Sequence, residues 1–317
     1  MHKRRLLGTS GSHALIFALD VILCFPAVAL VTARLDYRLD VLVHFLPYYI
    51  PVVAVLIFIN LLFRQFKSLF IPGATLLALL ITTRPYYLPW KGNASGPGIR
   101  LMHLNVNWYV NQNFDRVFDL IAQEQPEILC LLEIGRAWQR KIEELPFSHK
   151  FYELRDDPFG IGVFSNLEII EPRIVYFQAN RLPCIHFKIR VQDRLVELLY
   201  AHNYPPLNGG ASFARNDQTR NMAQFIRDGG NPFFILVGDL NVTPWSPHFK
   251  DLLDTTGMAD ARWGRGINPS WRWFDGLLRL PLDHFLYGKG IAVRDLHIGP
   301  SFYSDHLPLS VKFDLAP

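Results

Sequence analysis

Near the C-terminal end of the chain, Ser304-Asp305-His306 places a carboxylate beside an imidazole just before an apolar run. Other polar clusters also lie at the ends of apolar runs: Asn105-Val106-Asn107, Glu133, Gly238-Asp239-Leu240-Asn241 and Leu282-Asp283-His284. Each run is typical of a strand, which is a rigid support, and each cluster supplies side chains that bind cations or move protons. The repeated pattern predicts one convergent, oxygen-rich, metal-binding site.

The cluster chemistry favours a hard divalent cation. Carboxylate and carboxamide oxygens are the ligands that Mg²⁺ or Mn²⁺ prefers, together with water and substrate phosphate. Any single cluster could instead serve a turn or a helix cap, where Asn and Asp are common. Five clusters in one order argue against that reading. The cysteines, Cys24, Cys130 and Cys184, lie in apolar stretches and have no spacing typical of zinc.

From residue 99 onward, strand-like runs alternate with amphipathic patterns, which predicts an α/β domain of two packed sheets covered by helices. The expected helices are Phe114–Gln123 and Ser212–Arg227. The expected strands are Ile99–Asn105, Ile128–Leu132, Gly160–Phe164, Ile169–Phe177, Cys184–Val191, Leu195–Ala201, Phe233–Val237, His284–Tyr287, Ile291–Ile298 and Leu309–Phe313.

The first 91 residues differ in composition, with apolar runs at Leu15–Val31, Val41–Phe63 and Leu69–Ile81. A membrane-spanning helix needs about 20 mostly apolar residues. We therefore expect a membrane anchor of three helices, at about 13–33, 41–63 and 68–88. A cleaved signal peptide would explain only the first run, and buried core helices are the remaining alternative.

Charge suggests how such an anchor would be oriented. Lys3-Arg4-Arg5 favours a cytoplasmic N-terminus, and Arg64 with Lys67 suits a second cytoplasmic loop. Three crossings then place the large domain on the extracytoplasmic side. If the third run does not cross, the domain stays in the cytoplasm. The small, flexible segment 92–98 is a linker to the domain 99–317.

The two parts also differ in net charge. Residues 1–98 hold 9 Lys+Arg and 3 Asp+Glu, a net of +6, and the remaining residues hold 23 and 25, a net of −2. Proteins that bind duplex DNA usually carry a basic face. The charge of the large domain therefore does not favour a nucleic-acid partner.

The ordered motifs LNVN, LLEI, AHNYPP, GDLNVTPWS, LDHFLY and YSDHLPL resemble those of the endonuclease/exonuclease/phosphatase superfamily. The resemblance covers roughly residues 99–315. It implies a four-layered α/β/β/α sandwich of the DNase I type, and metal-dependent cleavage of a phosphate ester. The sequence thus leads us to expect this sandwich behind an N-terminal helical transmembrane segment.

The resemblance implies a role for each matching position. Glu133 is similar to the principal metal-binding glutamate, Asn105 to the metal-site residue that helps to position it and the metal water, and Asp305 to an aspartate that binds metal or assists the leaving group. Asp239 matches the residue that orients or deprotonates the attacking water, and Asn241 its phosphate-contacting neighbour. His306 matches the histidine that stabilises the pentacovalent phosphate, with Asp283 holding it. His202 matches a position near the scissile phosphate.

Some positions carry less specific signals. Asn107 stands where several nucleases have an aspartate, so it is a weaker metal candidate. Arg215 opens a predicted helix, where it either contacts phosphate or is simply solvated. His103 falls inside a strand pattern and reads as an ordinary core or surface histidine.

These features lead to one preferred function and two alternatives. The preferred function is a membrane-anchored, Mg²⁺-dependent phosphohydrolase that cleaves a phosphodiester or phosphomonoester by direct attack of water. A lipid head group or a small soluble ester is the favoured substrate. The alternatives are a nuclease and a catalytically silent, membrane-tethered interaction module.

Overall fold

The computed structural model describes residues 9–89, 98–108, 113–178 and 181–316. The chain divides into two compact units, residues 1–85 with 245–247, and residues 86–244 with 248–317. Most of the predicted linker 92–98, and the basic residues 3–5, lie outside the described residues.

The first unit is helical, with α1 (Thr9–Thr32), α2 (Tyr37–His44), α3 (Leu46–Leu62) and α4, which runs from Phe70 to Tyr87. Its surface is unusual for a soluble protein, because large apolar side chains such as Phe17, Ile22 and Phe58 are exposed. Its buried side chains include a polar pair, in which the Asn60 amide donates to both Asp20 carboxylate oxygens at 2.9 and 3.0 Å.

The predicted second helix, 41–63, is instead broken at Phe45, and α2 and α3 meet at a bend of 73°. Pro47 explains the break, because proline lacks an N–H and its ring clashes with the preceding helical turn. By length and composition, α1 is able to cross a membrane, and the bent pair α2–α3 could form a second, broken span. The third expected span, α4, does not meet that test although it is helical.

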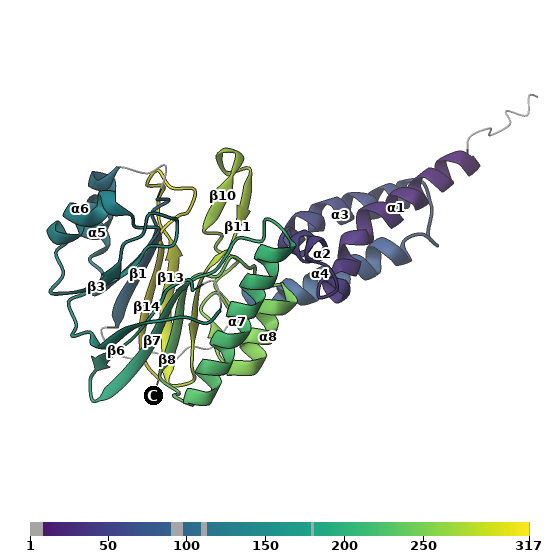
Figure 1. Ribbon diagram of the computed structural model, residues 1–317. Coiled ribbons are helices and arrows are strands. Elements are labelled where there is room, and N and C mark those ends of the chain that lie inside the picture. Colours follow the sequence, from purple (N-terminus) through teal and green to yellow (C-terminus); the bar gives the residue numbers. More distant parts are fainter. Residues whose placement is uncertain (1–8, 90–97, 109–112, 179–180, 317) are drawn as a thin grey trace, which may run out of the picture. The chain divides into compact units, whose positions relative to one another are not determined.

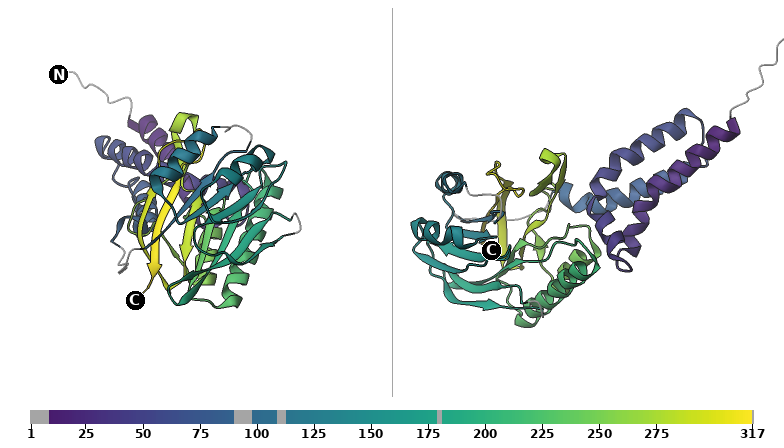
Figure 2. Two further views of the ribbon diagram at one scale, coloured as in Figure 1. Left: turned by 90° about the vertical axis from the view of Figure 1, so that its left-hand side faces the viewer. Right: turned by 45° about the horizontal axis from the view of Figure 1, so that its top comes forward.

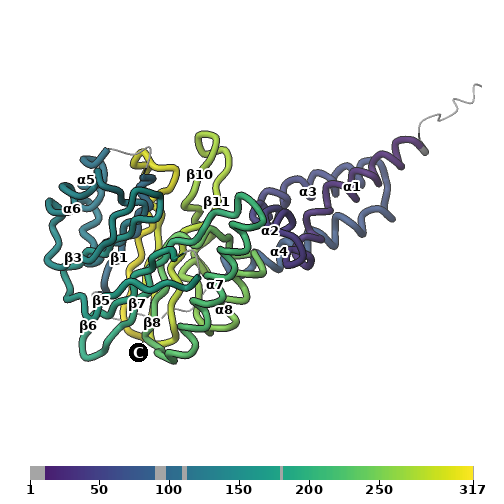
Figure 3. The backbone as a smooth tube through the Cα atoms, viewed as in Figure 1, coloured from purple at the N-terminus to yellow at the C-terminus, as the bar shows by residue number. Residues whose placement is uncertain are grey.

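The second unit contains two six-stranded sheets and a small hairpin. The first sheet has the order β13-β14-β1-β2-β4-β3, and the second has β5-β6-β7-β8-β12-β9. Strands β10 and β11 form the separate hairpin, which Figure 3 traces beside the label β11.

The strands of the first sheet are β1 (Ile99–Asn105), β2 (Ile128–Leu132), β3 (His149–Glu153), β4 (Ile161–Ser165), β13 (Ile291–Ile298) and β14 (Leu309–Leu315). Those of the second are β5 (Ile170–Val175), β6 (Cys184–Val191), β7 (Arg194–His202), β8 (Phe234–Asp239), β9 (Ala259–Asp260) and β12 (Asp283–Tyr287). The hairpin consists of β10 (Trp271–Trp273) and β11 (Leu278–Leu280). The helices are α5 (Phe114–Glu124), α6 (Gln139–Glu144), α7 (Gly209–Gly229) and α8 (Pro247–Thr256), with short 3-10 turns at Arg136–Trp138 and Phe274–Gly276.

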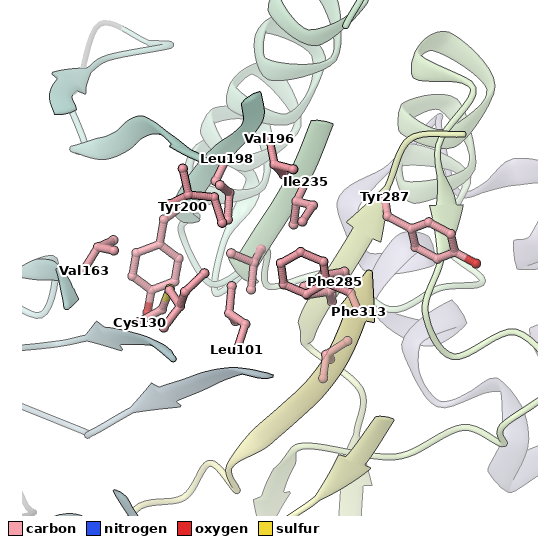
Figure 4. Packing of buried hydrophobic residues seen from close by; sticks show 14 of the residues in the cluster. Leu101, Cys130, Val163, Val196, Leu198, Tyr200, Ile235, Phe285, Tyr287 and Phe313 are labelled. Atoms are coloured by element: carbon pink, nitrogen blue, oxygen red, sulfur yellow. The ribbon is translucent and has the colours of Figure 1, made fainter. Parts of the chain in front are cut away.

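Three hydrophobic clusters hold these elements in four layers. The central cluster fills the space between the sheets, where Leu101, Tyr200 and Phe285 meet (Figure 4). A second cluster packs α5 and α6 on the outer face of the first sheet, and a third packs α7 and α8 on the outer face of the second (Figure 1). The expected α/β/β/α sandwich is confirmed.

Strand alternation decides which side chains face the space between the sheets. Successive residues of a strand point to opposite faces, so positions i, i+2 and i+4 share a face. On β1, Leu101 packs in the central cluster while Met102 packs in the outer one. His103 and Asn105 therefore continue the inward row of Leu101. The polar side chains that follow the apolar runs lie at the ends of such inward-facing rows.

Candidate active site

A row of three side chains crosses the second sheet at one level. His202 ends β7, Asp239 ends β8 and Asp283 begins β12, and the register pairs His202 with Asp239 and Asp239 with Asp283. Strand β7 is parallel to β8, whereas β12 is antiparallel to it. One edge of the sheet therefore collects the three side chains although they are far apart in sequence.

The first sheet supplies Asn105 and Glu133 opposite this row. The Asn105 amide nitrogen donates to Glu133 Oε1 at 3.0 Å and lies 3.4 Å from Asp239 Oδ2. The backbone N–H of Trp108 donates to Glu133 Oε2 at 3.1 Å. Asn105 Oδ1 is turned away and accepts the Asn107 N–H at 3.1 Å. Asn105 thus joins two carboxylates through its amide nitrogen, and in this orientation its oxygen is not directed at them.

His306 completes the site from the loop before β14. Its Nδ1 lies 2.8 Å from Asp283 Oδ2, and its Nε2 lies 3.5 Å from Asp239 Oδ2. Burial alone would lower the pKa of His306, but the carboxylates of Asp283 and Asp239 outweigh burial and raise the pKa from 6.5 to about 10. The imidazole is therefore a cation at neutral pH and a charged hydrogen-bond donor.

The carboxylates differ in their protonation chemistry. Burial raises the pKa of Asp239 well above its usual value, and the neighbouring Asp283 charge adds to that effect. Burial also raises the pKa of Glu133. Asp283 shows the opposite result, because His306 and the His103 hydrogen bond overcome its burial and hold its pKa well below the usual range. Asp239 is thus the more basic carboxylate, and Asp283 stays charged.

His202 is a neutral neighbour of these groups. Burial and the charge of His306 lower the pKa of His202 to about 3. Its Nε2 lies 3.6 Å from Asp239 Oδ2 and 4.0 Å from Glu133 Oε1, while Phe159 packs against its ring with centroids 5.0 Å apart. His202 therefore lies beside the carboxylates of Asp239 and Glu133 as a polar but uncharged side chain.

Asp305 and Asn107 form a hydrogen-bonded pair at the exposed side of the site. The Asn107 amide donates to Asp305 Oδ1 at 2.7 Å, and the Trp271 indole N–H donates to Asp305 Oδ2 at 3.0 Å. Both carboxylate oxygens of Asp305 are thus already accepting hydrogen bonds. Asp305 fixes Asn107 and Trp271 in this arrangement.

Asn241 and Arg215 support the loop after β8. The Asn241 N–H donates to Asp239 Oδ1 at 2.9 Å, and the Asn241 amide donates to the Asn203 carbonyl at 2.9 Å. Arg215 is fully buried and donates to the Asn241 carbonyl at 3.0 Å. Its Nε and Nη2 donate to Asn216 Oδ1 at 2.9 and 2.8 Å, so Arg215 is a buried residue that contacts the protein and not a solvated residue at the start of a helix.

Sequence reasoning missed His103 and Tyr200. His103 Nε2 lies 2.7 Å from Asp283 Oδ1, and His103 Nδ1 lies 2.9 Å from the Tyr200 hydroxyl. The alternation on β1 carried a usable signal, because His103 shares its face with Asn105, two residues further on. The position of Asp283 across the sheets could not be read from spacing.

The backbone at the site adopts the left-handed conformation at several non-glycine residues. The φ angles are 62° at Glu133, 53° at Asn107 and 49° at Asn241. This conformation costs free energy, least for Asn and more for a residue such as Glu. At Glu133 it directs the side chain beyond the end of β2, where strand alternation alone would turn it outward.

Two groups of atoms could take part in cation binding. Asp239, Asp283 and His306 offer buried ligand atoms within 4.8 Å of one another, among the described residues. However, Asp283 and His306 are already hydrogen-bonded to each other. Glu133 and Asp239 share one amide donor, and their raised pKa values indicate incomplete charge compensation. This oxygen-rich corner fits a hard divalent cation.

Comparisons with known proteins support the fold. None of the curated proteins compared with the chain matches its sequence. Among solved structures, the 3'-5' exonuclease NExo from Neisseria meningitidis is 18% identical, with a TM-score of 0.58 over 68% of this chain and 100% of that chain. D. rerio TDP2 complexed with a single-strand DNA product is 17% identical, with a TM-score of 0.59 over 69% of this chain and 100% of that one.

The human Nocturnin catalytic domain with a bound sulfate anion is also similar in structure. It is 19% identical, with a TM-score of 0.57 over 71% of this chain and 97% of that chain. Identities this low show the shared fold alone. The model of the Endonuclease/Exonuclease/phosphatase family matches residues 102–306, which include the site residues from both sheets. The chain belongs to the Endonuclease/Exonuclease/phosphatase family.

Proposed function

We propose that the chain is a membrane-anchored, divalent-metal-dependent phosphoesterase in which water attacks phosphorus directly. The observation that carries this proposal is the meeting of a cationic His306 with the basic carboxylate of Asp239, at 3.5 Å, beside Glu133. A charged donor and a strong base in one buried site suit an anionic substrate that is attacked by water.

The chain's own residues would divide the reaction between them. Asp239 accepts the proton of the attacking water as the new phosphorus–oxygen bond forms and the bond to the leaving oxygen breaks. His306 donates from Nε2 to a phosphoryl oxygen, while Asp283 keeps its Nδ1–H oriented. The Asn241 N–H holds the Asp239 carboxylate through Oδ1, and the neutral His202 flanks it.

Glu133, with Asp239 beside it, would hold the metal, with Mg²⁺ favoured and Mn²⁺ as the alternative. Such an ion supplies charge neutralisation at the phosphate. In the observed orientation Asn105 would position Glu133, and Asp305, which accepts from Asn107, would supply a further carboxylate for the metal. Removal of the metal should abolish turnover without unfolding the domain.

The first unit supports the membrane part of the proposal. Its exposed apolar side chains and its buried Asp20–Asn60 pair reverse the usual distribution of polarity in a soluble protein. A lipid head group or a small soluble phosphate ester therefore remains the favoured substrate class.

The test is an assay of the full-length protein in detergent micelles, with Mg²⁺, Mn²⁺ or EDTA. The substrates are a chromogenic phosphodiester, a chromogenic phosphomonoester, phospholipids in mixed micelles, and both plasmid and single-stranded DNA. Asp239→Asn should lower metal-dependent turnover about 10²- to 10⁴-fold, the usual contribution of a general base.

Asp314→Asn is the matched control, because Asp314 is a buried aspartate that pairs with Arg294 on β13. Its turnover should stay at the wild-type value. Metal-dependent cleavage of DNA alone would replace the proposal with a nuclease. Absence of metal-dependent turnover on every substrate would contradict the enzyme and favour a silent module.

A further inference from the structure

Asp283 has an imidazole on each of its carboxylate oxygens. Oδ2 is 2.8 Å from His306 Nδ1, and Oδ1 is 2.7 Å from His103 Nε2. His103 continues to Tyr200, whose hydroxyl lies 2.9 Å from His103 Nδ1. Asp283, His103 and Tyr200 are fully buried, and His306 is 5% exposed.

The direction of each hydrogen bond follows from the chemistry of the groups. An ionised carboxylate only accepts, so His103 Nε2 must carry a proton that it donates to Asp283. In a neutral ring Nδ1 is then an acceptor, and the Tyr200 hydroxyl donates to it. Tyr200 thereby selects the tautomer of His103 that can donate to Asp283.

This chain of contacts joins the two sheets beneath the site. His103 is on β1 of the first sheet, whereas Tyr200 is on β7 and Asp283 on β12 of the second. Figure 4 shows Tyr200 extending from β7 into the space between the sheets. The buried link therefore fixes a carboxylate of one sheet from a strand of the other.

The backbone of Asp283 is held separately from its carboxylate. Its N–H donates to Ser270 Oγ at 3.1 Å, and its carbonyl accepts from the buried Arg262 guanidinium. These bonds leave rotation of the carboxylate about the Cβ–Cγ bond to the two imidazoles. Without His103, Oδ1 would face the apolar core without its donor, and the plane of the carboxylate would lose its second support.

We propose that His103, held by Tyr200, is a positioning residue that fixes the Asp283 carboxylate and through it the direction of the His306 Nε2–H. This inference rests on the proposed function, because it assigns His306 as the donor to the phosphoryl group. His103 and Tyr200 touch neither substrate nor metal in this role.

The test uses the full-length protein with His103→Phe, which keeps a buried ring and removes both ring nitrogens. Its kcat should fall about 10- to 100-fold, the usual cost of losing an outer hydrogen-bond partner at a site, with KM within about 3-fold because ground-state binding is unchanged. His103→Gln, whose amide N–H can reach Asp283, should recover part of kcat. Tyr200→Phe should lower kcat by a smaller factor.

A spectroscopic measurement separates positioning from simple packing. In ¹⁵N-histidine-labelled protein, the wild type should show His103 as the Nε2–H tautomer and a hydrogen-bonded His306 Nδ1–H proton. Tyr200→Phe should mix the His103 tautomers, and His103→Phe should shift or broaden the His306 signal. This arm needs no substrate, so it reports on positioning even if the wild type proves inactive and the proposed function fails.

His186→Phe and Tyr287→Phe are the matched controls. His186 is a buried histidine that pairs with Glu197 at 2.5 Å, and Tyr287 lies in the same central cluster as Tyr200. Both should leave kcat and the His306 signal unchanged. A His103→Phe protein whose melting temperature falls while its kcat stays at the wild-type value would overturn the proposal. If His103→Phe does not fold, an unchanged kcat and His306 signal in Tyr200→Phe would overturn it.

Discussion

His306 must keep the proton on Nε2 at neutral pH if it is to donate to a phosphate oxygen, and the neighbouring carboxylates keep it protonated. Burial opposes the charge, but Asp283 and Asp239 outweigh it and raise the pKa of His306 to about 10. A raised pKa in the folded state stabilises the fold fully below the unfolded value of about 6.5. That contribution is lost progressively as the pH rises from there through the folded pKa.

The first prediction concerns this titration. In metal-free full-length protein, an NMR titration should show His306 losing its proton only near pH 10. Asp283→Asn removes the larger attracting charge, so the pKa of His306 should fall and the alkaline limb of kcat/KM should move to lower pH. Asp314→Asn should leave both unchanged. A titration of His306 near 6.5 in the wild type would contradict the assigned ion pairs.

The second prediction concerns the stability of Asp239. Burial raises its pKa, so its charge opposes folding at neutral pH, where the unfolded carboxyl is ionised. Asp239→Asn should therefore melt at the wild-type temperature or above it in EDTA, while activity is lost. Calorimetry in detergent is the measurement. A large drop in melting temperature would show that Asp239 acts mainly as a structural residue.

At the scale of elements, the site depends on how strands end. Gly238, just before Asp239, has a φ of 136°, and a Cβ there would lie 1.9 Å from the Ala201 carbonyl oxygen. Only glycine allows the parallel strands β7 and β8 to approach this closely at the level of His202 and Asp239. The glycine thus sets the spacing between two site residues.

The third prediction follows from that contact. Gly238→Ala should destabilise the domain by about 3 kcal/mol, at the upper end of overpacking effects, and should also lower kcat by displacing Asp239. Gly229→Ala is the control, because no heavy atom lies within 4 Å of a Cβ at that helical position. The measurements are the melting temperature and the turnover of both variants. A Gly238→Ala protein as stable and active as Gly229→Ala would refute the argument.

Much of the architecture could be predicted from local patterns. The expected strands that match β1, β2, β4 to β8 and β12 to β14 could be predicted because apolar runs such as Ile128–Leu132 are fully buried, and buried runs are visible in sequence. The two- and three-residue strands β9, β10 and β11 were not predicted. Strand β3 was missed because its residues, from His149 to Glu153, are only partly buried and show no apolar run. Helix α8 was also missed; it begins at Pro247, directly after the motif segment 238–246.

The site was predictable only in part, for a physical reason. Spacing places Asp239 and Glu133 at strand ends, where convergence is expected. It cannot show that Asn105 directs its amide nitrogen to them, that Arg215 is buried and donates to the Asn241 carbonyl, or that His103 bonds to Asp283. Those contacts depend on the packing of one sheet against the other, which no local pattern encodes.

At the scale of the whole molecule, the predicted placement of the large domain depends on whether the third apolar run crosses a membrane. That run forms α4, which is helical but is not among the described helices that are long and apolar enough to cross. The multi-pass anchor and the extracytoplasmic domain therefore remain predictions that rest on the basic residues of the N-terminal part.

The fourth prediction tests topology with single cysteines. All three native cysteines are buried, which gives a low labelling background. Asp193→Cys, at an exposed turn of the catalytic domain, should react with a membrane-impermeant maleimide in intact cells. Lys67→Cys, in the loop before α4, should react only after permeabilisation. Protection of both positions in intact cells would place the domain in the cytoplasm.

The left-handed backbone at Glu133 has a consequence for the history of such proteins. A residue that is unfavourable for the fold is retained only while selection acts on the reaction, and glycine adopts the same φ of 62° at no steric cost. Copies of this domain that are released from catalysis should therefore drift to glycine at position 133 and become more stable. A glutamate kept there marks a lineage that still depends on the chemistry.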